Sequence, residues 1–345
     1  MPRTAKMSVA TTTQGRVNTP PFVARRVRRP MSDQSRFANI TNSIPFPGFA
    51  AGPHTCVVAA PAKVNLFLEL TTKRPDGYHD LATLMSTIDL YDTLEVRLDP
   101  SGEISLNCDT PGIPTGPGNL VYKAALALQQ ATGTRLGCRI RLMKRIPSEA
   151  GLGGGSSDAA ATLAACNAIW NLHLTTKELT PVAATIGSDV AFFLHGGVAW
   201  CTGRGEIVVP LKVSHQFHLV VVKPAIGLST AEVYKHADLP TVQQDGTAIR
   251  AAMIAGDATA IAASLFNRLQ APAFGLQPTV ATVYDRLVSC GPLGCLLSGS
   301  GSSVFAICRD REDAARVARA FVAHCPANVV QPAVFIVRSP SSDFD

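Results

Sequence analysis

A glycine-rich loop is the part of this chain best suited to bind a charged ligand. It reads Pro147-Ser148-Glu149-Ala150-Gly151-Leu152-Gly153-Gly154-Gly155-Ser156-Ser157 and is followed by an Ala-rich segment. Residues 138–144 before it have the composition of a β-strand, so a strand, a glycine loop and a helix start follow in order. A helix N-terminus offers unpaired N–H groups and positive dipole charge, and glycines let an anion approach the backbone. The loop is therefore predicted to bind phosphate.

Neither common phosphate-loop motif fits this sequence. A Walker A motif requires Lys before its final Ser or Thr, and no Lys precedes Ser156. In a dinucleotide-binding motif that starts at Gly151 and Gly153, the third glycine would fall at Ser156. The alternative interpretation is a flexible glycine-rich turn whose helix is capped by Ser156 or Ser157.

Composition indicates a globular chain that keeps its thiols reduced. A length of 345 residues is typical of about two domains, and 46% apolar residues suffice for a buried core. No run approaches the roughly 18 apolar residues that a membrane-spanning helix needs. The nine cysteines are odd in number and include no CxxC pair, which argues against a disulfide framework or a zinc site.

The positive charge of the chain lies in its first 50 residues. These contain eight basic residues against the single acid Asp33, so the rest of the chain, within a total of +6, carries about −1. That remainder lacks the basic surface that binds nucleic acid. Residues 1–53 are predicted to be a disordered basic tail or a targeting segment. We favour a disordered or untranslated tail, with Met31 as a later start, over a transit peptide.

Strand and helix patterns indicate an α+β chain whose order begins near His54. Strands are expected at 55–60 and 63–70, broken at Pro61, and at 92–98, 138–144, 198–201, 206–209, 219–222, 294–297, 304–308 and 334–337. Helices are expected at 119–131, from the glycine loop to about 170, and at 177–186, 230–235, 247–255, 259–266, 279–289 and 312–323. A turn is predicted at residues 74–77, and a second unit is expected to begin near Phe217.

Five segments, in this order, resemble the GHMP kinase superfamily. They are Ala60-Pro61-Ala62-Lys63-Val64-Asn65, Arg74-Pro75-Asp76-Gly77-Tyr78-His79-Asp80-Leu81, the glycine loop, Gly187-Ser188-Asp189-Val190-Ala191-Phe192-Phe193, and Leu297-Ser298-Gly299-Ser300-Gly301-Ser302-Ser303-Val304-Phe305. The resemblance covers about residues 55–338 and points to members that phosphorylate a cytidine-diphosphate-linked methylerythritol in the non-mevalonate isoprenoid pathway. It implies a two-domain α+β GHMP kinase fold. The N-terminal domain, 54–215, would be similar to domain 2 of ribosomal protein S5, and the C-terminal domain, 216–340, would be a ferredoxin-like α/β sandwich.

The resemblance also implies roles for individual residues. In that family the glycine loop wraps the phosphates of ATP, which assigns Pro147 to Ser157 to ATP. Asp189 matches the catalytic aspartate, expected to receive the proton of the substrate's 2-hydroxyl, and Lys63 matches the lysine that stabilises developing charge. Taken alone, Lys63 would be a solvated strand residue and Asp189 a helix cap. Mg²⁺ is expected with ATP. The sequence fixes no metal ligand, and the residues that could contact the ion are Ser156, Ser157 and Asp158.

The substrate's cytosine is expected at Tyr78 and His79, where a ring can stack and an imidazole can read the base edge. Tyr234 would stack on the base from the other side, in a segment with Thr230 that is similar to the family's second substrate segment. Asn65 would share the strand face of the catalytic lysine. The alternatives are a hairpin tip packed on the core at Tyr78 and His79, and a packed helix at Tyr234.

Two positions depart from the family pattern. Ala191 replaces the usual Pro, and Ser148-Glu149-Ala150 replace residues that are often glycine, so Glu149 must point away from phosphates to avoid repulsion. The turn at 298–302 is expected to face the glycine loop across the cleft, or to be only a tight hairpin.

The expected partner is a small-molecule substrate, with no nucleic acid and no membrane, bound by a monomer or weak homodimer. Two rival functions stay open. One is a GHMP kinase that acts on mevalonate or homoserine, which Asp76-Gly77-Tyr78-His79 argues against. The other is a catalytically silent nucleotide-binding protein, which the presence of both Lys63 and Asp189 argues against. We expect a cytoplasmic location, or a plastid if residues 1–53 are a transit peptide.

Overall fold

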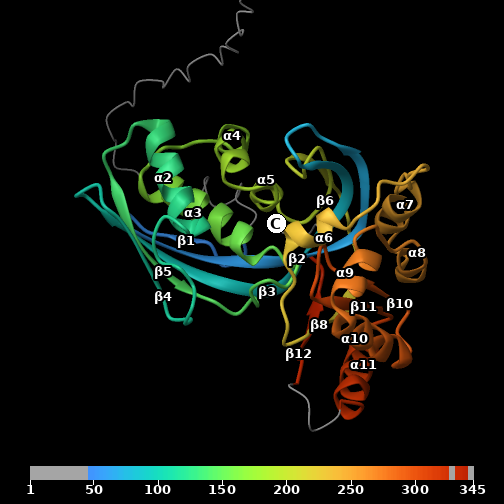
Figure 1. Ribbon diagram of the computed structural model, residues 1–345. Helices are drawn as coiled ribbons and strands as arrows, with labels where there is room; N and C mark the ends of the chain where they lie inside the picture. Colours follow the sequence, from blue (N-terminus) through green and yellow to red (C-terminus); the bar gives the residue numbers. More distant parts are fainter. Residues whose placement is uncertain (1–45, 326–330, 341–345) are drawn as a thin grey trace, which may run out of the picture. The chain divides into compact units, whose positions relative to one another are not determined.

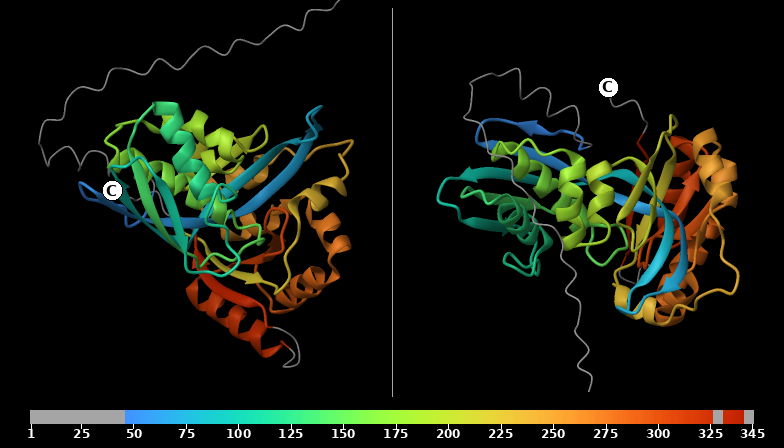
Figure 2. Two further views of the ribbon diagram at one scale, coloured as in Figure 1. Left: turned by 60° about the vertical axis from the view of Figure 1, so that its left-hand side comes forward. Right: turned by 90° about the horizontal axis from the view of Figure 1, so that it is seen from above.

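Two β-sheets with helices packed on them make up residues 46–325 and 331–340, the part of the chain that the computed structural model describes (Figure 1; Figure 2). The strands of the first sheet are β1 (Ala50–Ala51), β2 (Thr55–Lys73), β3 (His79–Asp99), β4 (Ile104–Cys108), β5 (Gly137–Met143), β6 (Val198–Thr202), β7 (Ile207–Leu211) and β9 (Phe266–Asn267). Their order is β1-β2-β3-β5-β4, with β6 paired to β3 and β7, and β9 paired to β2.

A long hairpin of β2 and β3 forms the centre of the first sheet. The predicted turn closes it, with the Gly77 amide donating to the Arg74 carbonyl over 3.1 Å. The predicted break at Pro61 is wrong: β2 continues through it, and the pairing with β3 shifts register between Pro61 and Ala62. Such a shift leaves backbone groups unpaired, which suits proline because it has no N–H to donate. The two long strands therefore run on as one continuous hairpin, on which the other strands of the sheet pair.

Four helices cover one face of the first sheet (Figure 1). They are α2 (Leu120–Thr132), α3 (Gly154–Ile169), α4 (Thr176–Ile186) and α5 (Val190–His195). The central helix, α3, is rich in alanine, and nearly all of it is buried against β2, β3, α2 and α5. Small side chains let a helix approach its neighbours closely, so the N-terminus of α3 is fixed against the strand that carries Lys63.

The second sheet has the antiparallel order β10-β11-β8-β12. Its strands are β8 (His218–Lys223), β10 (Gly294–Leu297), β11 (Val304–Cys308) and β12 (Ala333–Arg338), and the remaining helices are α6 (Thr230–Lys235), α7 (Thr247–Ala255), α8 (Ala258–Ala263), α9 (Gln270–Leu276), α10 (Pro278–Ser289) and α11 (Arg311–Ala323). The sequence of β8 is an uninterrupted apolar run because both faces of this strand are buried. Val220 and Val222 pack with α10 and α11, while Leu219 and Val221 pack in one cluster with Val64 of β2.

This shared cluster joins the two sheets through side chains from residues 62–67, 217–221 and 305–307. The α+β architecture is the expected one. The shared cluster contains residues from both sides of the predicted domain boundary between residues 215 and 216. That boundary therefore stays a prediction.

Two further expectations from the sequence need correction. Order begins before His54: Phe46 is buried in the core, and Ala50 pairs with Val57. The helix expected at 259–266 ends at Ala263, and residues 266–267 pair with β2 instead. The elements β4 and α9 were not predicted, since each is too short to show a clear period. Most of the predicted basic tail, residues 1–45, lies outside the described residues. Within the described ranges, no helix has the length and apolar character to cross a bilayer.

Candidate active site

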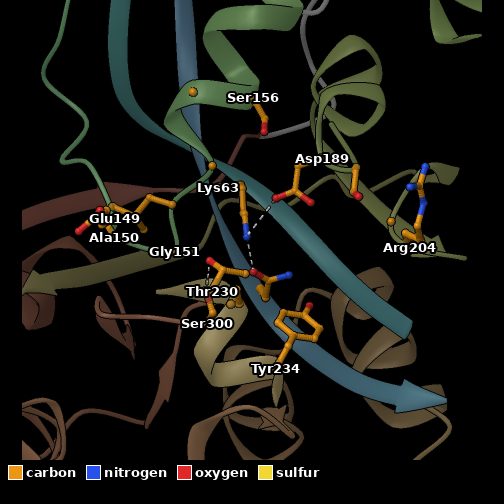
Figure 3. Close-up of a pocket in the computed structure, with 18 of the residues that line it drawn as sticks. Lys63, Glu149, Ala150, Gly151, Ser156, Asp189, Arg204, Thr230, Tyr234 and Ser300 are labelled. Atoms are coloured by element: carbon orange, nitrogen blue, oxygen red, sulfur yellow. Dashed lines mark hydrogen bonds and ion pairs between the residues drawn. The ribbon is translucent and has the colours of Figure 1, made fainter. Parts of the chain in front are cut away.

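A cavity of about 1290 Å³ brings together residues that are far apart in the sequence (Figure 3). Apart from Ser157, which is fully buried, all of the predicted site residues line it. They are Lys63, Asn65, Tyr78, His79, Pro147, Ser148, Glu149, Ala150, Gly151, Leu152, Gly153, Gly154, Gly155, Ser156, Asp189, Thr230 and Tyr234. The cavity is thus lined by β2, by the loop before α3, and by α6 of the second part of the chain.

The glycine loop leads directly into α3 without a side-chain cap. Gly153 is the N-cap residue at a φ of 69°, and no side chain accepts a hydrogen bond from the first turn. The alternative in which Ser156 or Ser157 caps the helix is therefore wrong; the Ser157 hydroxyl has no hydrogen-bond partner. The first N–H groups of α3 remain available for an anion.

A turn between β10 and β11 holds the glycine loop by its carbonyl groups. The Ser298 hydroxyl donates to the Gly151 carbonyl over 3.0 Å, and the Ser303 amide donates to the Ala150 carbonyl over 3.1 Å. At Gly151, where φ is +71°, a Cβ would lie only 2.0 Å from the Ser298 carbonyl oxygen. The turn thus contacts the loop directly rather than facing it across a cleft, and only glycine fits at the contact.

Glu149 does not place its carboxylate among the glycine-loop amides. A Cβ built on Gly227 would lie 2.2 Å from the Glu149 carboxylate, which therefore packs against the segment after β8. In Figure 3 this side chain extends away from Lys63. Burial lowers the pKa of the nearby Lys223, and the negative charge of Glu149 partly opposes that shift. The backbone of Glu149 can line the cavity without its charge repelling a phosphate.

Lys63 and Asp189 meet at the floor of the cavity. Lys63 is only 4% exposed, so it is not a solvated strand residue, and its Nζ lies 3.6 Å from Asp189 Oδ2. Asp189 stands at the N-cap position of α5, yet its side chain makes no capping hydrogen bond. Its carboxylate is therefore directed to the lysine and the cavity rather than to the helix (Figure 3).

A chain of hydrogen bonds orients the lysine. The Thr83 hydroxyl donates to the Phe67 carbonyl over 2.6 Å, so it can only accept from Asn65 Nδ2, at 2.8 Å. The amide oxygen of Asn65 consequently faces Lys63 Nζ and accepts a hydrogen bond of 2.5 Å. Lys63, Asn65 and Thr83 are all buried, which limits rearrangement of this chain.

A second buried lysine lies behind the glycine loop. Lys144 Nζ donates to Asp158 Oδ2 over 2.8 Å and also to Asp92. Burial raises the pKa of Asp158 to about 8, while Lys144 opposes the shift and Asp92 adds to it. For Lys144, burial is outweighed by the two carboxylates, so its pKa is raised. This cluster ties β3 and the residue after β5 to the N-terminal half of α3.

The opposite end of the cavity is aromatic. Tyr78 is 56% exposed, and the rings of His79 and Tyr234 lie with centroids 5.8 Å apart. Burial, assisted by the charge of Lys73, lowers the pKa of His79, and burial raises the pKa of Tyr234. Thr230 shares a 2.8 Å hydrogen bond with Ser300.

Several cavity residues escaped the sequence analysis. Thr83, Lys144 and Arg204 are the clearest examples. Lys144 ends the strand segment immediately before the glycine loop, and Arg204 lies inside the Gly203–Gly205 turn, so their positions beside motifs were available signals. No signal in the sequence pointed to Thr83, since its hydrogen bonds depend on the pairing between distant strand segments.

Comparison with known proteins gives consistent matches. One family model, described as GHMP kinases N terminal domain, matches residues 119–197, and another, GHMP kinases C terminal, matches residues 249–327. A 4-diphosphocytidyl-2-C-methyl-D-erythritol kinase of Exiguobacterium sibiricum is 44% identical over 264 residues, which cover 76% of this chain and 92% of the relative. A protein of the same name from Pelotomaculum thermopropionicum is 45% identical over 261 residues, which cover 75% and 91%.

Solved structures agree with these matches. A crystal structure of 4-(cytidine 5'-diphospho)-2C-methyl-D-erythritol kinase has a TM-score of 0.68 at 36% identity and covers 83% of this chain and 100% of its own. A homoserine kinase from Cytophaga hutchinsonii has a TM-score of 0.68 at 21% identity and covers 85% and 96%, a likeness of fold alone.

Proposed function

The chain belongs to the GHMP kinases, in the 4-diphosphocytidyl-2-C-methyl-D-erythritol kinase family, and we propose that it phosphorylates the 2-hydroxyl of that substrate with ATP. The products are the 2-phosphate and ADP, in non-mevalonate isopentenyl diphosphate biosynthesis. The observation that carries the mechanism is the Lys63–Asp189 pair, with 3.6 Å between Nζ and Oδ2, in the same cavity as the glycine loop.

ATP is proposed to bind with its phosphates on the glycine loop, Pro147 to Ser157. The uncapped N-terminus of α3 supports this, because its N–H groups and dipole favour negative charge. The Ser298–Ser303 turn holds the loop in one shape before the nucleotide arrives. Such preorganisation lowers the cost of ordering the site on binding.

Mg²⁺ fits this site as an ion carried chiefly by ATP. The described residues contain no group of three or more His, Cys, Asp or Glu able to hold a metal. The Ser156 hydroxyl lines the cavity and offers the kind of oxygen ligand that Mg²⁺ prefers. Asp158 also lines the cavity but is 2% exposed; its Oδ2 accepts from Lys144, and its buried Oδ1 has no hydrogen-bond partner. We propose that the Ser156 hydroxyl is the protein group that would contact the ion brought by ATP. The ion would neutralise charge on the transferred phosphoryl group.

The transfer step is proposed to use Asp189 and Lys63. The substrate's 2-hydroxyl oxygen attacks the γ-phosphorus, the bond from that phosphorus to the β–γ bridging oxygen breaks, and the hydroxyl proton passes to Asp189. Lys63 Nζ, held by Asn65, stabilises the negative charge that develops on the attacking and transferred oxygens. Lys63 is buried, and Asp189, whose side chain is partly exposed to the cavity, makes no capping hydrogen bond that would compete for its carboxylate.

The cytosine of the substrate is proposed to bind among Tyr78, His79 and Tyr234. The exposed ring of Tyr78 offers a stacking face at the cavity mouth, and the lowered pKa of His79 leaves a neutral imidazole to read the base edge. Thr230 and Asn65 lie toward the transfer centre and are proposed to contact the erythritol unit.

A cytoplasmic location is also proposed. The nine cysteines are free, as expected for a reducing compartment. The oligomeric state stays a prediction of monomer or weak homodimer.

A coupled ADP-release assay with three acceptors tests the proposed function. We expect turnover with 4-diphosphocytidyl-2-C-methyl-D-erythritol and little with mevalonate or homoserine. Clear turnover with either of the other acceptors, and none with the first, would replace the substrate assignment. Absence of turnover with all three, with ATP still bound, would favour a silent nucleotide-binding protein.

A further inference from the structure

The negatively charged diphosphate of the acceptor substrate needs a binding group that differs from the ATP loop. Basic side chains that line the described cavity are Lys63, Lys73, Lys144, Arg204 and Lys235. Lys63 and Lys144 are buried and each is already paired with carboxylate groups. Lys73 and Lys235 are exposed lysines at element ends, free to move in solvent. Arg204 is the candidate that the surrounding structure fixes in place.

Arg204 lies on a turn that contacts both functional ends of the cavity. The turn joins β6 to β7, and the Leu81 amide anchors it by donating to the Gly203 carbonyl over 2.7 Å. On one side, the guanidinium carbon lies 5.3 Å from the centre of the Tyr78 ring. On the other, a Cβ built on Gly205 would lie 3.6 Å from Asp189 Oδ1. Figure 3 shows Arg204 beyond Asp189 as seen from Lys63.

This position matches the order of groups in the substrate. Its diphosphate joins the cytidine to the erythritol unit, so it must lie between the base site and the transfer centre. The turn that carries Arg204 bridges the same two places. Two carboxylates are near the guanidinium: Glu206, whose Oε1 lies 3.9 Å from Arg204 Nε, and Asp76, which is within electrostatic range. The Glu206 contact is longer than a hydrogen bond, so most of the five N–H donors remain available.

We propose that Arg204 determines acceptor specificity by stacking on Tyr78 and binding the diphosphate of the substrate. A planar guanidinium can do both at once, since it stacks on an aromatic ring and donates two parallel hydrogen bonds to phosphate oxygens. The inference rests on the proposed function, because only a nucleoside-diphosphate acceptor presents this group beside the base.

The test compares Arg204→Gln with wild type for the acceptor and for two competitive inhibitors, cytidine and cytidine diphosphate. We expect the KM for the acceptor to rise about tenfold or more, while the KM for ATP changes less than twofold. The wild type should prefer cytidine diphosphate over cytidine, and Arg204→Gln should reduce that preference by about tenfold. Arg204→Lys, which keeps the charge but not the fork, should recover part of the preference.

Arg250→Gln is the matched control. In the native chain the guanidinium carbon of Arg250 also lies over an aromatic ring, 4.6 Å from the centre of Trp200, but Arg250 does not line the cavity. We expect this variant to keep wild-type kinetics. Lys73→Gln tests the competing cation, and a larger loss of preference there than at Arg204 would overturn the inference.

Two further outcomes would refute it. An unchanged ratio of cytidine diphosphate to cytidine affinity in Arg204→Gln would exclude a diphosphate contact. An equal weakening of both inhibitors would mean that Arg204 only orients Tyr78. The inhibitor affinities are also measured by calorimetry, so the role of Arg204 is tested even if wild type fails to phosphorylate the acceptor, a result that would reject the proposed function instead.

Discussion

Replacing Thr83 with Val tests whether a residue outside the proposed chemistry positions the lysine that takes part in it. Val keeps the branched shape of Thr but removes the hydroxyl that accepts from Asn65 and donates to the Phe67 carbonyl. Without that acceptor, the Asn65 amide is free to rotate. Its oxygen is then no longer held toward Lys63 Nζ.

The size of the effect follows from the burial of these groups. Thr83 and Asn65 are 2% and 3% exposed, so water cannot replace the lost partner without entering the core. One donor and one acceptor lose their bonds, and we expect the free energy of unfolding to fall by about 2–4 kcal/mol. A misplaced lysine should lower kcat by about 10- to 100-fold. The KM for ATP should change little, because the glycine loop is held independently by the Ser298–Ser303 turn.

Thr83→Ser is the matched control, since it keeps the hydroxyl and loses only a methyl group. Urea unfolding gives the stability of both variants, and the coupled ADP-release assay gives kcat and KM. We expect Thr83→Ser to lose about 1 kcal/mol or less and to keep a kcat near wild type. A folded Thr83→Val with wild-type kcat would refute the positioning chain, as would an equal fall in kcat for both variants.

Three further predictions concern the base, the loop and a buried acid. Asp189→Asn should lower kcat by roughly 100-fold or more while calorimetry finds ATP affinity nearly unchanged; loss of ATP binding with kcat retained would reject its role as base. Gly151→Ala should lower both Tm and ATP affinity, because its Cβ would lie 2.0 Å from the Ser298 carbonyl oxygen at positive φ. Gly275→Ala, in α9 with no atom within 4 Å of the new Cβ, should keep or raise Tm, and equal shifts in the two variants would contradict this steric account. Burial raises the pKa of Asp158 from 3.8 to about 8. Between about pH 4 and pH 8 the folded chain therefore retains a proton that the unfolded chain has released. The free energy of unfolding should consequently fall as pH rises through this range. Asp158→Asn should flatten this slope in urea unfolding at about pH 5 and pH 8, and an unchanged slope would assign it to another group.

Much of the fold could be predicted because local residue patterns indicate most of its helices and strands. The helix at 119–131 matches α2, with Asn119 as its cap, and the strand before the glycine loop matches β5 within one residue. Pro61 misled the prediction because a proline breaks most strands, and nothing in the neighbouring residues announces a register shift. The two-residue strand β9 exists only through its pairing with Phe67 and Leu68, a contact across about 200 residues that no local pattern encodes.

The candidate site also has a part that could be predicted from local sequence and a part that depends on the folded chain. The glycine loop could be recognised from its own residues, whereas the proximity of Lys63 to Asp189 required either a family resemblance or the folded chain. Glu149 looked unfavourable in the sequence, and only the position of Gly227 after β8 explains why its charge is tolerated. Arg204 was missed because a basic residue in a glycine turn is usually solvated, and its contact with Tyr78 depends on two separate hairpins.

The hydrogen bonds from Ser298 and Ser303 to the glycine loop have a consequence for the order of events during synthesis. A ribosome releases residues 147–157 well before residues 298–303, and chains begin to fold from the N-terminal side. Until the later turn emerges, the loop carbonyls lack these donors, so a nascent chain should not hold nucleotide. ATP then stabilises only the completed fold, and a partly made or C-terminally truncated chain gains nothing from the cell's nucleotide pool.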